Sequence, residues 1–108
     1  MKKLLPAVVI ACLLLTGCGG TPRMSVAESC TFLSGDTFKP TGNQQQQADQ
    51  IAKHYQEVAD KVAPEIADPI QKMADVMKQV AGTALGDKSE AQIAELTKQN
   101  NRIGDICK

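Results

Sequence analysis

From Ser25 to Lys108, apolar side chains recur at helical spacing, and this periodicity limits the possible folds more than any other feature. Helical spacing occurs four times in this region, whereas an alternation of apolar and polar residues never persists. With two Phe, one Tyr and no Trp, the chain also has little material for an aromatic stacking surface. We therefore expect an all-α fold.

The first and the last of these helices begin at a capping-box motif. In this motif a serine hydroxyl and a polar side chain three residues later satisfy backbone N–H groups that the first helical turn leaves free. The motifs predict a short helix over about 25–34 and a long helix over about 89–106, with a loop from 36 to 43 after the first. The two pairs are Ser25 with Glu28 and Ser89 with Gln92.

Prolines divide the middle of the chain into two further long helices. The second helix is expected over about 44–62, and the third begins between residues 64 and 69 and ends near Ala81. Asp68 followed by Pro69 favours an N-cap and first helical residue, because proline has no N–H and fits a first turn. Two acid–base pairs four residues apart should stabilise the second helix slightly: Asp49 with Lys53, and Glu57 with Lys61.

Each long helix carries its apolar residues on one face. Three such helices with short links predict an up-down-up bundle, with the short helix packed across it. The faces are narrow and rich in alanine, which indicates a small core. They consist of Ile51, Tyr55, Val58 and Val62; of Ile66, Ile70, Met73, Met77 and Val80; and of Ile93, Leu96, Ile103 and Cys107. Asn100 shares the last face; we favour a solvent-facing edge for it over a buried register-setting position.

The start of the chain resembles the leader of bacterial lipoproteins. Met1-Lys2-Lys3 is basic, and the apolar stretch Leu4–Leu15 is shorter than the roughly 20 residues that cross a membrane. Leu15-Thr16-Gly17-Cys18 then matches the lipobox, and the resemblance implies a diacylglyceryl group on the Cys18 thiol. The alternative is an ordinary signal peptide followed by an incidental cysteine.

The same resemblance implies how the chain is divided and where it resides. A signal peptide over 1–17 would be cleaved, 18–24 would be a tether, and 25–108 would be the helical domain. The mature part is mildly acidic, so the acyl chains rather than charge would hold it at the membrane. We expect an extracytoplasmic location on the cell membrane or the outer membrane. Gly19, which is not an aspartate, is compatible with outer-membrane sorting.

Two cysteines then remain in the mature chain, Cys30 and Cys107. Exported proteins face an environment that permits oxidation, where an even remainder of cysteines is usually paired. Both cysteines also fall on the apolar face of their own helix. We therefore expect a Cys30–Cys107 disulfide, with the two Cα atoms within about 7 Å of each other.

The sequence contains few candidate catalytic, metal-binding or phosphate-binding residues. His54 is the only histidine and lies one helical turn from Glu57, but a structural metal site normally needs three or four ligands. Met73 and Met77 fit a core better than a copper site, and no phosphate-binding glycine motif occurs. We therefore expect no enzyme, no cofactor and no metal site.

Two functions remain. The balance of 12 basic and 12 acidic residues excludes a polybasic nucleic-acid binder and an acidic disordered tail. We expect a non-catalytic interaction or structural module that is anchored through Cys18 and has a protein partner in the envelope. In its size and its expected lipid anchor, the chain is similar to small lipoproteins of bacteria and prophages, some of which block incoming phage DNA. The alternative is a small carrier that binds an apolar ligand between its helices.

Overall fold

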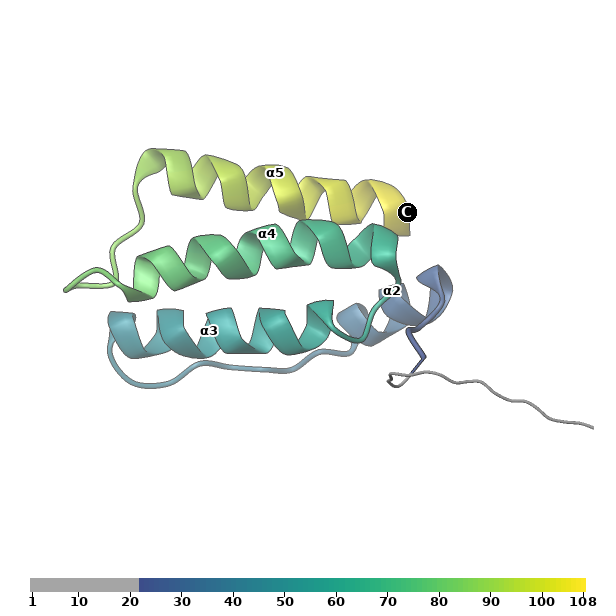
Figure 1. Ribbon diagram of the computed structural model, residues 1–108, viewed down its shortest axis with the longest axis horizontal. Coiled ribbons are helices and arrows are strands. Elements are labelled where there is room, and N and C mark those ends of the chain that lie inside the picture. Colours follow the sequence, from purple (N-terminus) through teal and green to yellow (C-terminus); the bar gives the residue numbers. More distant parts are fainter. Residues whose placement is uncertain (1–21) are drawn as a thin grey trace, which may run out of the picture.

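The computed structural model describes residues 22–108, and this part of the chain folds into helices and the loops that join them (Figure 1). It contains no strand, so the prediction of an all-α fold with three longer helices and a shorter one before them is confirmed. The predictions for residues 1–17 and for Cys18 lie outside the described residues. The elements are α2 (Val26–Ser34), α3 (Gln44–Ala59), α4 (Pro64–Ala81) and α5 (Glu90–Cys107).

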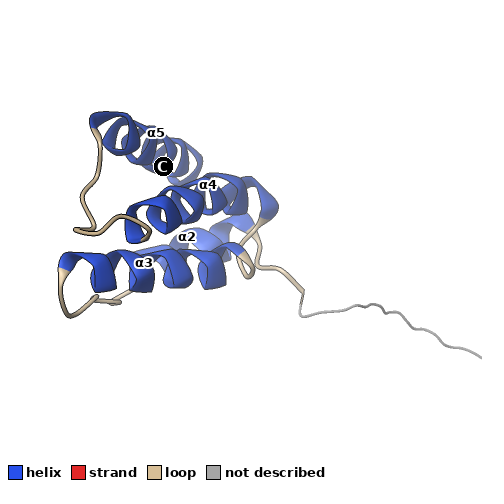
Figure 2. Cartoon of the chain, turned by 60° about the vertical axis from the view of Figure 1, so that its left-hand side comes forward, coloured by secondary structure: helices blue, strands red, loops and turns tan. Residues whose placement is uncertain are grey.

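The three long helices run up, down and up, as predicted, with α4 in the middle (Figures 1 and 2). The most extensive contact is between α3 and α4, followed by that between α4 and α5. The short helix α2 packs against α4 and α5 at one end of the bundle. Because α3 and α5 lie on two sides of α4, one face of the bundle is open between them.

Capping boxes begin three of the four described helices. Those at Ser25 and Ser89 are formed as predicted, with reciprocal hydrogen bonds to Glu28 and Gln92. A third box, in which Asn43 pairs with Gln46, begins α3 and was not anticipated. Within the polar run at 44–47, Gln46 therefore satisfies a backbone N–H group at the start of the helix.

The second helix ends earlier than predicted, at Ala59 instead of residue 62. Proline disfavours the helical conformation in the residue before it, so Ala63 is extended and the chain must turn before Pro64. Val62 is fully buried, but in this turn and not on the helix. Lys61 lies beyond the helix end and forms no ion pair with Glu57 in the described chain, whereas the predicted Asp49–Lys53 pair is present at 3.0 Å.

The third helix begins at Pro64, within the predicted range of 64–69, but the interpretation of Asp68 and Pro69 as its N-cap and first residue is wrong. Pro64 occupies the first turn, where its missing N–H costs nothing. The earlier start places Ile66, which is fully buried, on the same face as Ile70. Pro69 lies inside the helix with its ring buried, and this apolar burial offsets the loss of one backbone hydrogen bond.

The predicted face of the fourth helix packs against the core at Leu96, Ile103 and Cys107 but not at Ile93. Ile93 is 50% exposed, whereas Gln99 is 1% exposed and points toward the bundle. The buried amide is satisfied because Gln99 donates a hydrogen bond to Glu95 and accepts one from Arg102. Arg102 also contacts Asp68 of α4 at 2.9 Å. This polar network connects α5 to α4, and Asn100 is exposed as expected.

The core has two parts along the length of α4. One lies at the α2 end and the other near the start of α3. Alanines on α3 allow its backbone to approach α4 closely, which confirms an alanine-rich contact. The buried residues of the two parts are Val58, Ala59, Val62, Ile66, Ile70 and Met73, and then Ala48, Ala52, Val76, Met77 and Val80.

Candidate functional site

The structure brings together the two cysteines that remain after Cys18. Cys30 of α2 and Cys107 at the end of α5 have Cα atoms 5.6 Å apart, and their sulfur atoms are at disulfide distance. The predicted separation of less than about 7 Å is therefore confirmed. Both residues are half-buried and pack against the α2-end part of the core. The pair links the first and last described helices.

A groove opens between α3 and α5 on the exposed face of the bundle. Its volume is about 320 Å³, and α4 forms its floor. The apolar lining comes from all three long helices, while most of the polar lining comes from α5 and the loop before it. The lining residues are Ile51, Tyr55, Met73, Met77, Lys88, Leu96, Thr97 and Asn100.

The groove is suited to apolar contact and not to acid–base chemistry. Burial raises the pKa of the Tyr55 hydroxyl, and the negative charge of Asp36 raises it further, so this group remains neutral at physiological pH. Thr97 and Asn100 supply neutral hydrogen-bonding groups beside Leu96. A nucleophile needs a base within hydrogen-bonding reach, and the side chains that line this groove provide no such pair.

A second cluster, which we did not predict, joins the loop after α2 to α3. The Asp36 carboxylate accepts a hydrogen bond from Nε2 of His54 at 2.6 Å, and this bond holds the pKa of Asp36 below its usual value. The Phe38 ring stacks on the His54 ring with centroids 4.1 Å apart. His54 therefore makes a structural contact between the loop and α3. The sequence analysis missed this cluster because the periodicity of apolar residues within a helix carries no information about which loop residues contact it.

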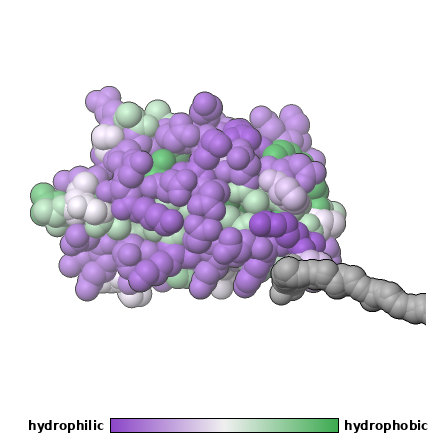
Figure 3. Space-filling model, in the orientation of Figure 1, coloured by the Kyte–Doolittle hydropathy of each residue, from purple (hydrophilic) through white to green (hydrophobic). Residues whose placement is uncertain are grey.

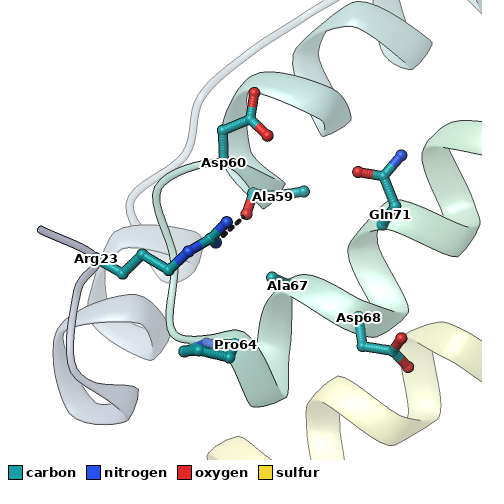
Figure 4. A pocket seen from close by; sticks show the side chains of 7 residues that line it. All are labelled: Arg23, Ala59, Asp60, Pro64, Ala67, Asp68 and Gln71. Carbon is teal, nitrogen blue, oxygen red and sulfur yellow. Dashed lines mark hydrogen bonds between the residues drawn. The ribbon is translucent and has the colours of Figure 1, made fainter. Parts of the chain in front are cut away.

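The third cluster is at the turn between α3 and α4 (Figure 4). Nη1 of Arg23 donates to the carbonyl oxygens of Ala59 at 2.7 Å and Val62 at 3.2 Å. The N–H of Met24 donates to the carbonyl oxygen of Lys61 at 2.9 Å. Arg23 and Met24, which we assigned to a tether, are therefore hydrogen-bonded to the helical body. A cation at the C-terminal end of α3 also complements the helix dipole.

Within residues 22–108, no three His, Cys, Asp or Glu side chains gather as metal ligands would. In the same range, none of the helices is both long enough and apolar enough to cross a membrane. Comparison of the chain with protein-family models, with curated proteins and with solved structures gave no match. The candidate sites therefore rest on the geometry of the groove and on the sequence around Cys18.

Proposed function

We propose that this protein is a lipid-anchored, extracytoplasmic lipoprotein of bacterial or prophage origin that acts as a non-catalytic interaction module at the cell envelope. The lipobox at Leu15-Thr16-Gly17-Cys18 supports the anchor. The Cys30–Cys107 pair, at disulfide distance, is in keeping with export to an oxidising compartment. The partners are the membrane, through Cys18, and an envelope protein.

The observation that carries the interaction role is the open groove between α3 and α5. Its apolar lining includes Ile51, Tyr55 and Leu96, which are only partly covered by the chain itself. Lys88, Thr97 and Asn100 add polar groups at the same surface. Partly exposed apolar residues with polar neighbours are the usual composition of a protein-binding surface. An amphipathic helix of the partner would fit such a groove.

The anchor is tested by feeding cells a clickable fatty acid and measuring the label on the protein. Wild type should be labelled, and Cys18→Ser should lose the label and leave the membrane fraction. Cys12→Ser is the matched control, because Cys12 lies in the expected signal peptide and its loss should leave the label unchanged. Equal labelling of wild type and Cys18→Ser would refute the lipoprotein assignment.

The groove is tested with a photo-crosslinking amino acid in the full-length protein in its native host. At Thr97, an exposed residue that lines the groove, it should give a discrete protein adduct. At Lys98, exposed on the same helix but outside the groove lining, it should not. Leu96→Glu should then remove the adduct by placing a charge in the apolar lining. Equal adducts from both positions would contradict a role for the groove.

The carrier remains the second candidate because the groove volume of about 320 Å³ lies at the lower end of the range for small-molecule sites. Native mass spectrometry of the detergent-extracted full chain distinguishes the two functions. A stoichiometric small molecule that is lost in Leu96→Glu favours the carrier. An unliganded mass together with the Thr97 adduct favours the interaction module.

A further inference from the structure

Apolar side chains gather at the α2 end of the molecule without being fully covered. An open hollow of about 480 Å³, which we call the α2 hollow, is lined by Met24, Ala27, Glu28, Thr31 and Phe32. Further apolar residues of α2 and α5, which pack against the part of the core at this end, are also only partly buried. These are Val26, Leu33, Ile103 and Ile106. Figure 3 shows hydrophobic surface at this end of the molecule.

The chain enters the helical body at this same end. Three hydrogen bonds from Arg23 and Met24 hold the entry point on the turn between α3 and α4. This turn lies at the α2 end in Figure 1. The direction from which the body is tethered is therefore set by the fold at Arg23.

Little chain separates this entry point from the proposed site of acylation. Five residue steps lead from Cys18 to Arg23, and even a fully extended chain covers only about 17 Å in that number of steps. The opposite end of the bundle is one length of α4 away, or about 27 Å for its 18 residues. A lipid-attached Cys18 would therefore keep the α2 end, and not the loop between α4 and α5, near the bilayer.

We propose that the α2 hollow is a membrane-contact surface that rests on the lipid bilayer and orients the bundle with its α4–α5 loop outward. This inference rests on the proposed function, because the anchor brings the surface to the lipid. The lining contains no cation that could attract lipid phosphates: four of its five residues are uncharged, and the fifth is Glu28, whose carboxylate accepts a hydrogen bond from the backbone of Ser25. The contact should therefore be insensitive to salt.

Tryptophan fluorescence tests this orientation, because the chain contains no Trp. Ala27→Trp and Thr31→Trp place a single reporter at two exposed positions of the hollow, and Leu85→Trp places one in the α4–α5 loop, where Leu85 is 70% exposed. Each variant is produced from the full sequence, purified in its acylated form and reconstituted in phosphatidylcholine vesicles with or without bromine on the acyl chains. We expect both hollow reporters to shift to shorter wavelength and lose emission with bromine, in low and high salt, while Leu85→Trp is unaffected.

Two readouts separate failure of this inference from failure of the proposed function. If Cys18 carries the fatty acid and the protein floats with the vesicles, unquenched hollow reporters overturn the membrane contact and leave the anchor intact. Equal quenching of Leu85→Trp overturns the orientation. Absence of the fatty acid from Cys18 overturns the proposed function itself, and the inference falls with it.

Discussion

At the scale of single residues, Ser29 shows how one buried hydroxyl can define a helix start elsewhere in the chain. Ser29 is fully buried in α2, and its Oγ accepts a hydrogen bond from the N–H of Ala63 at 2.8 Å. The same hydroxyl donates to the carbonyl oxygen of Ser25 at 2.7 Å. Ala63 precedes α4 and has no capping side chain of its own. Ser29 therefore satisfies a backbone group that the local sequence leaves unpaired.

Ser29→Ala should lower the free energy of unfolding by about 1–3 kcal/mol, because it leaves the buried N–H of Ala63 without a partner. For a domain of this size that corresponds to a fall of several degrees in Tm, roughly 4–8 °C per kcal/mol. Thermal melts followed by far-UV circular dichroism measure it. Ser34→Ala is the control, because the Ser34 hydroxyl bonds within α2 at an exposed position and its loss should change little.

A pH-dependent contribution to stability is expected from Asp36. The hydrogen bond from His54 holds the pKa of Asp36 below its ordinary value, so this contribution is complete above about pH 4 and is lost as the pH falls through the lowered pKa. Asp36→Asn should cost about 1 kcal/mol at neutral pH and progressively less in acid. Urea unfolding across this pH range measures the difference. Asp105→Asn, at an exposed site on α5, should cost little at any pH; a constant cost for Asp36→Asn would contradict the assignment.

At the scale of elements, the loop between α4 and α5 is held by a glycine that allows close contact with the start of α3. Gly86 is buried with a φ of +67°, a conformation that side-chain-bearing residues rarely adopt. A Cβ atom there would lie 2.6 Å from the backbone nitrogen of Gln45. The loop thus packs on α3 only because this position has no side chain. Gly104, in contrast, lies on an exposed part of α5, where an added Cβ atom would meet no neighbour within 4 Å.

The two glycines should respond oppositely to substitution by alanine. Gly86→Ala should destabilise the protein by at least about 1–2 kcal/mol, from the left-handed backbone conformation alone, and contact with the α3 backbone adds to this. Gly104→Ala should stabilise it by about 0.5–1 kcal/mol, because glycine in a helix loses more backbone entropy on folding than alanine does. Urea unfolding of both variants beside wild type gives the two values. A stabilising Gly86→Ala would show that the loop does not pack as described.

At the scale of the whole molecule, Cys30 and Cys107 close almost the entire described chain into one loop. They are 77 positions apart in the sequence. Among the four described helices, the thiols lie on the two that do not form the α3–α4 contact, which is the largest in the bundle. A covalent link at this place would therefore restrain the elements that the core holds least.

A Cys30–Cys107 disulfide should be found by mass spectrometry of non-reduced peptides from protein taken directly from the envelope. For a loop of this length, the gain in entropy of the unfolded chain on reduction should lower the free energy of unfolding by about 4–5 kcal/mol. This is similar to the lower range of net stability for a whole domain. The double variant Cys30→Ala and Cys107→Ala should therefore melt far below wild type and no longer respond to reductant. Free thiols at both positions in native protein would refute the pairing.

The sequence by itself determined the helical class, the number of helices after Ser25, two of the capping boxes and the pairing of Cys30 with Cys107 in space. These follow from periodicity, from local hydrogen bonds and from the two cysteines that remain when the lipoprotein resemblance sets Cys12 and Cys18 aside, none of which depends on where other elements lie. Only the tertiary structure decided where α4 begins, that Gln99 of α5 is buried while Ile93 is exposed, and what Arg23 binds. Pro64 and Pro69 are equally good starts locally, and the choice between them depends on burial of Ile66 and on a hydroxyl from another helix. Such contacts join residues far apart in the chain, and no local pattern encodes them.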